Sequence, residues 1–130
     1  MLSLSPRMRV FAAAQPIDFR KGFDGLVQIV RDRFELDPFG GDYFVFFNRR
    51  RDRVKLLVWD KNGFWLFYKR LERGTFERVD GRGPRIEIDR ARLAMLLEGI
   101  DLKQGKIRQH FTEDIRARAR DDHERERAAG

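Results

Sequence analysis

Apolar and polar positions in the first third of the chain predict a strand followed by a helix. Residues 8–13, MRVFAA, suit a short β-strand, and QPIDFRKG then forms a turn bounded by proline and glycine. From about residue 22 to residue 34 the apolar side chains recur at helical spacing, on a face formed by Phe23, Leu26, Val27, Val30 and Phe34. Pro38 disfavours helical backbone at the residue before it, so the helix should end before this point.

Three runs of aromatic and β-branched residues in the middle of the chain predict strands over residues 43–47, 54–59 and 64–71. The turn DKNG between the last two leaves two geometries open. Asp60 and Gly63 suit the ends of a type I turn with a glycine bulge, whereas Asn62 and Gly63 alone suit a two-residue turn. In both, one face of the hairpin carries Val54, Leu56, Val58, Trp65 and Phe67. Neither face is wholly polar, so we expect the sheet to be covered on both sides, at least in part.

The last elements follow from weaker patterns. A glycine-rich connection spans residues 72–84, where Phe76 is a candidate start for a short strand. Ile86 and Ile88 mark a further candidate strand. Asp89 suits the N-cap of a second helix, and Gly99 is placed to end it. Ile100 then lies either on this helix or just beyond it, and the other apolar residues of its face are Leu93, Leu96 and Leu97.

These elements predict one α+β domain over residues 1–102. We expect a mainly antiparallel sheet of four to five strands packed against two helices. Residues 103–130 have few apolar side chains and dense mixed charge. They are expected to form a charged, polar C-terminal tail that is partly helical or disordered.

Composition narrows the class of protein further. The chain of 130 residues has no cysteine, which excludes disulfides and cysteine-based zinc sites. No apolar run is long enough for a membrane span, and the start of the chain lacks the apolar run of a signal peptide. We therefore expect a cytoplasmic protein without membrane contact and without a cofactor, since neither a Walker loop nor a Rossmann fingerprint occurs.

The positive charge is concentrated in one region. The chain has a net charge of +7, and residues 48–78, with 10 basic and 4 acidic side chains, contribute +6 of it. Charge gathered in this way suits an anionic partner. It lies on the candidate nucleic-acid-binding residues Arg49, Arg50, Arg51, Arg53, Lys55, Lys69, Arg70 and Arg73.

Antiparallel pairing should bring residues 69–71 beside residues 53–55, so that these charges meet at one end of the sheet. Like charges opposite one another destabilise a sheet, and a phosphate backbone would neutralise them. The alternative to nucleic-acid binding is a charged hairpin turn that only contacts solvent, and the sequence does not decide between the two. The DFRKG turn, with Arg20 and Lys21, is a candidate addition to the same surface.

Other chemistries are weaker candidates. The strand aromatics offer faces for base stacking, but a chain of this size needs such residues in its core. Asp18, Asp24, Asp42, Asp60 and Glu98 are candidate carboxylates of a metal-dependent nuclease, although the first two are better explained as caps of the first helix. His110 and His123 lie in the polar tail without a metal-ligand pattern. We therefore expect no catalytic site.

Three segments together resemble a known family. They are DFRKGFDGLVQIV, DPFGGDYFVFFNRRRDRVKLLVWDKNGFWLFYKRLERGTF and LAMLLEGID, in this order over roughly residues 8–102. This arrangement is similar to the small TnpB-type accessory protein, the product of the second open reading frame, of the insertion sequence sixty-six family. The extension from Lys103 departs from the family, whose members commonly stop soon after LEGID.

The resemblance implies a non-catalytic accessory protein for DNA transposition. Its implied partners are DNA, the transposase and the second accessory protein of the element. On this interpretation the basic hairpin surface contacts DNA phosphates without reading the base sequence. The alternative is a protein-interaction module, whose basic surface meets an acidic patch on the transposase or the other accessory protein. The sequence leaves the oligomeric state open, and a homo-oligomer is one alternative, because a half-covered aromatic sheet can dimerise.

Overall fold

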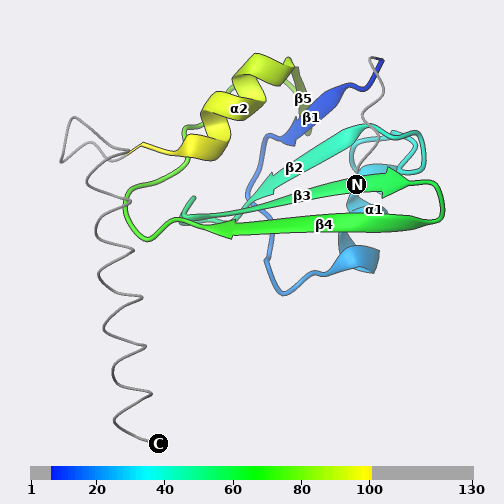
Figure 1. The fold of residues 1–130 in the computed structure, drawn as a ribbon, viewed down its shortest axis with the longest axis horizontal. Coiled ribbons are helices and arrows are strands. Elements are labelled where there is room, and N and C mark those ends of the chain that lie inside the picture. The colour runs from blue at the N-terminus through cyan, green and yellow to red at the C-terminus, as the bar shows by residue number, and fades with distance from the viewer. Residues whose placement is uncertain (1–6, 101–130) are drawn as a thin grey trace, which may run out of the picture.

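The computed structural model of the protein describes residues 7–100, so the predicted tail over residues 103–130 lies outside the described residues. The elements follow in the order β1 (Val10–Ala13), α1 (Phe23–Asp32), β2 (Tyr43–Phe47), β3 (Arg53–Asp60), β4 (Gly63–Arg70), β5 (Arg85–Ile88) and α2 (Arg90–Glu98) (Figure 1). The predicted α+β class is therefore confirmed. Neither helix of this part of the chain has the length and apolar character that crossing a membrane requires.

The five strands form one mixed sheet in the order β4-β3-β2-β1-β5. The β1–β2 pair is parallel, and the other three pairs are antiparallel. A parallel pair needs a long crossover, and the segment that contains α1 supplies it. The strand predicted from Phe76 is wrong, because its neighbour Thr75 makes only an isolated bridge to Ile100.

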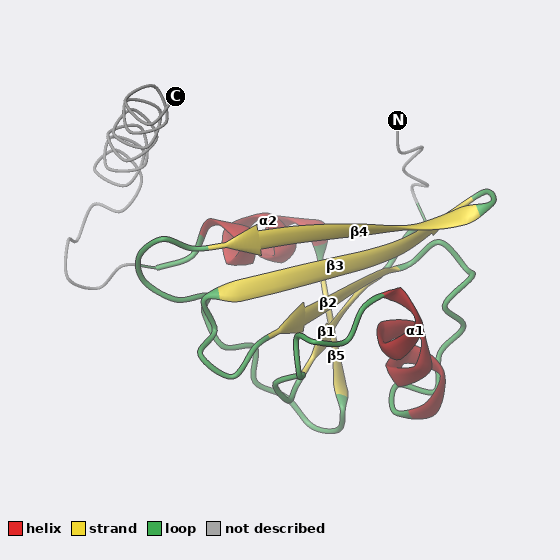
Figure 2. Cartoon of the chain, turned by 90° about the horizontal axis from the view of Figure 1, so that it is seen from below, coloured by secondary structure: helices red, strands yellow, loops and turns green. Residues whose placement is uncertain are grey.

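Helices cover both faces of the sheet, as the apolar character of both hairpin faces predicted. Figure 2 shows α2 on one side of the sheet and α1 on the other. The α1 side is an apolar layer of Phe11, Phe44, Phe46 and Leu57 from the strands against Leu26, Ile29, Val30 and Phe34. The prediction that Phe23 faces this core is wrong: Phe23 is 47% exposed, and Ile29 is buried instead.

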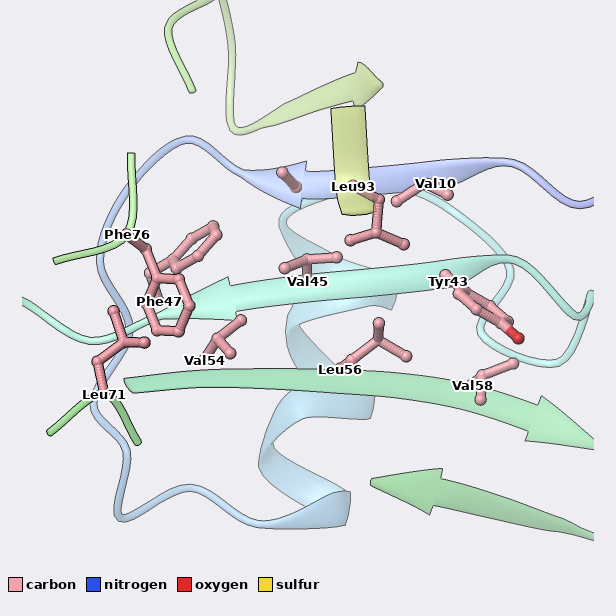
Figure 3. Close-up of a cluster of buried hydrophobic side chains, with 11 residues drawn as sticks. Val10, Tyr43, Val45, Phe47, Val54, Leu56, Val58, Leu71, Phe76 and Leu93 are labelled. Carbon is pink, nitrogen blue, oxygen red and sulfur yellow. The ribbon is translucent and has the colours of Figure 1, made fainter. Parts of the chain in front are cut away.

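The opposite layer lies between the sheet and α2. Figure 3 shows alternate side chains of β1, β2 and β3 pointing into it, with Leu93 of α2 above them and Leu71 and Phe76 closing one end. Strand β2 contributes to both layers, and all five of its residues are buried. Alternation along a strand makes this possible, because successive side chains point to opposite faces.

The β3–β4 hairpin uses the predicted faces with a turn that differs from both candidates. Asp60 pairs with Gly63, which leaves Lys61 and Asn62 in the turn. Lys61 has φ 54, whereas Gly63 is absent from the glycines with positive φ, so no glycine bulge forms. A left-handed backbone at a lysine is uncommon and costs free energy. The face assignment is confirmed, since Val58 lies opposite Trp65 and Leu56 opposite Phe67.

Helix α2 begins and ends as its caps predict. The Asp89 carboxylate accepts a hydrogen bond from the Arg92 N–H at 2.7 Å. Gly99 ends the helix at φ 76, a backbone conformation that glycine adopts without steric cost. A Cβ at this position would lie 2.7 Å from a methyl carbon of Leu71, so the glycine also permits close packing. Ile100 lies beyond the helix, paired with Thr75.

The buried aromatic centre of the α1 layer should dominate the stability of the domain. Phe44 is fully buried, and its ring centroid lies 6.0 Å from that of Phe11 and 6.4 Å from that of Phe34. We expect Phe44→Ala to lower the free energy of unfolding by about 3–5 kcal/mol, because it leaves a cavity in a packed core. Urea denaturation measures this loss. The control is Phe23→Ala, which should change stability by less than about 1 kcal/mol; equal losses in the two variants would contradict this assignment of the core.

Candidate nucleic-acid interface

Arg49 and Arg50 lie at the tip of the turn that joins β2 to β3. Asn48 shapes this turn: its side-chain amide donates to an Asp52 carboxylate oxygen at 2.6 Å, and its side-chain oxygen accepts from the Arg53 N–H at 3.0 Å. Both Arg49 and Arg50 are exposed. Their side chains make no hydrogen bond or ion pair with other described residues, which leaves two cations open to solvent.

Arg51 points back into the protein. Its Nε donates to the Phe76 carbonyl at 3.2 Å and its Nη2 to the Glu77 carbonyl at 2.6 Å. Its guanidinium carbon lies 4.6 Å from the centre of the Phe47 ring, within the range of a cation–π interaction. The Arg51 backbone has φ 58, and its carbonyl accepts from the Phe76 N–H at 2.7 Å. This arginine therefore ties the turn to the segment after β4.

Two of the candidate lysines complete backbone hydrogen bonding. Lys55 is 5% exposed, and its Nζ donates to the carbonyls of Phe19 at 2.9 Å and Lys21 at 2.8 Å. The same ammonium lies near the rings of Phe19 and Tyr68. Lys69 donates to the Leu97 carbonyl at 2.6 Å, in the last turn of α2, where carbonyls lack partners within the helix.

Two arginines on the surface have a carboxylate partner two residues away. Arg70 pairs with Glu72 at 2.9 Å, which raises the pKa of Arg70. Arg20 pairs with Asp18 at 2.7 Å, and its side chain is otherwise exposed to solvent. Hydrogen bonds from Arg20 lower the pKa of Asp18 to about 2.

The same pair corrects the predicted cap of the first helix. The N-cap of α1 is Gly22, with no side-chain cap hydrogen bond, while the Asp18 carboxylate accepts from the Arg20 N–H at 3.0 Å. Asp18 therefore stabilises the preceding turn and does not cap the helix. Asp24 lies in the first turn of α1, where its charge favours the helix dipole.

The predicted convergence of charge at one end of the sheet is confirmed for the strands. Arg53 lies directly opposite Arg70, and its Nη1 donates to the Tyr68 hydroxyl at 3.0 Å. Arg73 follows β4 and is half-buried, and Lys21, whose carbonyl accepts from Lys55, is exposed. Arg53, Arg70 and the turn of residues 49–51 thus lie at one end of the sheet, whereas Arg20 and Lys21 belong to the loop between β1 and α1.

Arg78, which is not among the candidate residues from the sequence, contributes to the same end. Burial lowers the pKa of Arg51, the like charge of Arg78 lowers it further, and Asp80 acts in the opposite direction. Arg78 belongs to the glycine-rich connection before β5, 27 positions after Arg51. No local pattern marked it, although its place inside the basic window of residues 48–78 was a signal.

The candidate carboxylates are distributed over the structure. Asp42 accepts from the Arg9 N–H at 3.0 Å, and Asp60 accepts from the Trp65 ring N–H at 3.2 Å. Among residues 7–100, no three histidine or acidic side chains lie close enough together to hold a metal ion. His110 and His123 lie outside the described residues.

The aromatic side chains divide between core and surface. Those of β2 are buried, as expected for a small domain. Those of the edge strand β4 are not: Trp65 is 46%, Phe67 44% and Tyr68 49% exposed. The Trp65 and Phe67 rings stack on one face with centroids 6.0 Å apart. The outer edge of β4 therefore presents both an unpaired strand and apolar rings.

Comparisons with known proteins give one family match and two similar curated proteins. A family model described as "IS66 Orf2 like protein" matches residues 8–107. Two curated proteins of Sinorhizobium fredii (strain NBRC 101917 / NGR234) are similar over 101 residues. Uncharacterized protein y4jC is 36% identical, covering 78% of this chain and 86% of that protein. Uncharacterized protein y4hO is 39% identical, covering 78% of this chain and 88% of that protein. No solved structure matches with significance.

We expect Lys55 to contribute to the stability of the fold, whether or not it contacts a ligand. We expect Lys55→Met to lower the free energy of unfolding by about 1–3 kcal/mol, because it leaves the Phe19 and Lys21 carbonyls without their donor. Chemical denaturation measures this effect. Lys61→Gln, at the exposed β3–β4 turn, is the charge-matched control and should stay within about 0.5 kcal/mol of the parent protein. Unchanged stability in Lys55→Met would show that this lysine is not structural.

The Asp18–Arg20 pair should contribute to the pH dependence of stability. A folded-state pKa of about 2 lies below the ordinary value of 3.8, so the pair stabilises the folded protein above about pH 4. That contribution is lost as pH falls from about 4 through about 2. In Arg20→Gln we expect the pKa of Asp18 to rise towards 3.8, measured by NMR titration of its carboxyl carbon. An unchanged pKa would mean that Arg20 does not bind Asp18 in solution.

Proposed function

The chain belongs to the IS66 Orf2-like family, and from this premise we propose that it is a non-catalytic accessory protein of DNA transposition that binds the DNA phosphate backbone. Family membership implies a role in the transposition of an insertion sequence, and the family is generally considered accessory. The finer part of the proposal, contact with DNA, rests on the arrangement of cations at one end of the sheet.

One observation carries the DNA contact: two adjacent arginines, Arg49 and Arg50, are exposed at a turn whose backbone is fixed from both sides. Asn48 and Asp52 close the turn, and Arg51 ties it to the segment after β4. A rigid turn loses little conformational freedom when it binds, so less of the interaction energy is spent on ordering it. Exposed guanidinium groups suit phosphate oxygens, because their planar donors match that geometry.

The other candidate cations fall into two groups under this proposal. The first group would add positive potential to the surface and comprises Arg53, Arg70, Arg73, Arg20 and Lys21. Of these, Arg20 and Arg70 would have to exchange a carboxylate for a phosphate. Arg51, Lys55 and Lys69 bond to backbone carbonyls and support the surface from within. Phosphate contacts of this kind position a protein on DNA without selecting a base sequence.

In this proposal the protein acts on element ends together with the transposase and the second accessory protein. DNA is held at the basic end of the sheet. The transposase or the second accessory protein is assembled on the DNA beside it. The contribution of the protein is positioning, and the chemistry of strand transfer belongs to the transposase.

A second candidate function is a protein-interaction module that does not contact DNA. The exposed aromatic side chains of β4 favour it, because an unpaired edge strand can receive a strand from a partner. The basic surface would then meet an acidic patch on the transposase or the other accessory protein and guide association. The two candidates differ in whether the purified protein binds DNA by itself.

Binding of short single- and double-stranded DNA should fall steeply with salt. We expect Arg49→Gln/Arg50→Gln to reduce the magnitude of the slope of log K against log salt by about 2 for double-stranded DNA, one unit for each lost phosphate contact. Fluorescence anisotropy over a salt series measures both slopes. Both substitutions are at exposed side chains, so the free energy of unfolding should remain within about 0.5 kcal/mol of the parent value.

The control for this experiment is Arg31→Gln/Arg33→Gln, which removes two exposed charges from the end of α1. It should leave the salt slope close to that of the parent protein. If both double variants changed the salt slope equally, DNA binding would depend on the overall charge of the protein and not on a site at Arg49 and Arg50. Absence of DNA binding at low salt, together with a stable complex with the transposase that Trp65→Ser/Phe67→Ser abolishes, would favour the protein-interaction function.

A further inference from the structure

A hollow of about 200 Å³ lies where three loops meet at one end of the sheet. Strands β1 and β2 are parallel, so the segments that follow them leave the sheet at the same end. The connection before β5 arrives there too, because Arg85 pairs with Ala13. The hollow is lined by Ala14, Gln15, Pro16, Arg49, Arg51, Arg78, Val79, Asp80 and Gly81.

The charges on this lining are not balanced. Arg49, Arg51 and Arg78 contribute three guanidinium groups, and Asp80 contributes one carboxylate. The side chains of Arg49 and Arg78 make no hydrogen bond or ion pair with other described residues. Cations gathered in a concave site repel one another and raise the local concentration of anions. A bound anion would relieve that repulsion.

Arg51 is held in place before any ligand arrives. Two of its five N–H donors bind the Phe76 and Glu77 carbonyls, and its guanidinium lies over the Phe47 ring. Three N–H donors of the same group remain. Fixing a guanidinium by other contacts lowers the entropy that it loses when it binds a ligand.

The backbone around the hollow is also fixed. The Ala14 N–H donates to the Pro84 carbonyl at 3.0 Å, and the Ile17 N–H donates to the Phe47 carbonyl at 2.9 Å. At Gly81 a Cβ would lie 2.8 Å from a side-chain carbon of Ile86, so this loop packs directly on β5. The backbone that lines the hollow is therefore held without a ligand.

Size and charge together select the ligand. The hollow is smaller than the roughly 300–1,000 Å³ of pockets that enclose drug-sized ligands, so it suits a single small group and not a nucleoside. A phosphate group offers several acceptor oxygens and one or two negative charges to the three arginines, which are the preferred partners of phosphate in proteins.

We propose that this hollow binds one phosphate group, held by Arg49, Arg51 and Arg78. The inference deepens the proposed function and rests on it in one respect, because the phosphate is taken to be that of the DNA backbone. Free inorganic phosphate shares the same chemistry and is the other source. Arg78 then joins the turn at Arg49 as a contact residue, and Asp80 limits the affinity by repelling the ligand.

The test uses Arg78→Gln and Asp80→Asn in the full chain, because neither side chain is hydrogen-bonded to the described backbone as Arg51 is. Inorganic phosphate is titrated against the parent protein and both variants, with sodium chloride at equal ionic strength as the reference, and the arginine Nε–H signals are followed by NMR.

We expect Arg78→Gln to weaken phosphate binding by about tenfold or more, because hydrogen bonds to charged groups are strong. Asp80→Asn should tighten it, and Lys61→Gln, at the opposite end of β3, should leave it unchanged (Figure 1).

DNA binding over a salt series, with the same variants, identifies the source of the phosphate. A slope reduced by about 1 in Arg78→Gln supports a backbone phosphate in the hollow. Phosphate binding with an unchanged DNA slope supports the site and overturns its assignment to DNA. DNA binding without phosphate-specific shifts at these arginines, and without any effect of Arg78→Gln, overturns the site and leaves the proposed function standing. Phosphate binding by a protein that does not bind DNA supports the site and overturns the proposed function.

Discussion

Strand β2 is buried on both of its faces, and the turn that we propose as the DNA contact begins at its end. Its alternate side chains fill the α1 layer and the α2 layer, so a slip of one residue would exchange two sets of core residues. At its last residue, the Phe47 carbonyl accepts from Ile17 and the Phe47 ring lies under Arg51. The turn with Arg49 and Arg50 therefore begins at a residue that is fixed by a backbone hydrogen bond and by a ring contact.

Cations that are close in the sequence have different physical roles. Arg51, Lys55 and Lys69 donate to backbone carbonyls of loops and of a helix end, where the regular backbone leaves acceptors without partners. Arg49 and Arg50 have no such acceptor among residues 7–100 and remain at the surface. The engaged cations fix the backbone around the turn, and under the proposed function this rigidity lowers the entropy that the phosphate-binding arginines lose on binding.

Under the proposed function, DNA binding and protein binding would use different surfaces of the β3–β4 hairpin. Strand β4 exposes aromatic rings along its edge, while its last residue, Arg70, lies at the basic end of the sheet. Binding DNA at that end would leave most of the β4 edge accessible. Under the proposed function this arrangement lets one small domain contact DNA and a protein of the transposition machinery at the same time.

Local patterns by themselves determined much of this fold. Strand alternation, the Asp89 cap and the Gly99 stop depend on residues a few positions apart. The five strands of the sheet, the second helix and the two-sided covering were predictable from them, whereas the strand expected from Phe76 does not form. The short hairpin turn also required residues 69–71 to lie beside residues 53–55, because antiparallel pairing follows from the turn. The sequence likewise showed which segment carries the positive charge, because the net charge of a segment can be counted without knowing how it packs.

Only the tertiary structure decided which cations stay available to a ligand. Lys55 reaches carbonyls 34 and 36 positions away, and Arg51 reaches carbonyls 25 and 26 positions away. Such partners are set by how loops pack on the sheet, and no spacing within one segment encodes them. The same reason explains why Ile29 and not Phe23 faces the core, and why Arg78 meets Arg51 across a shared hollow.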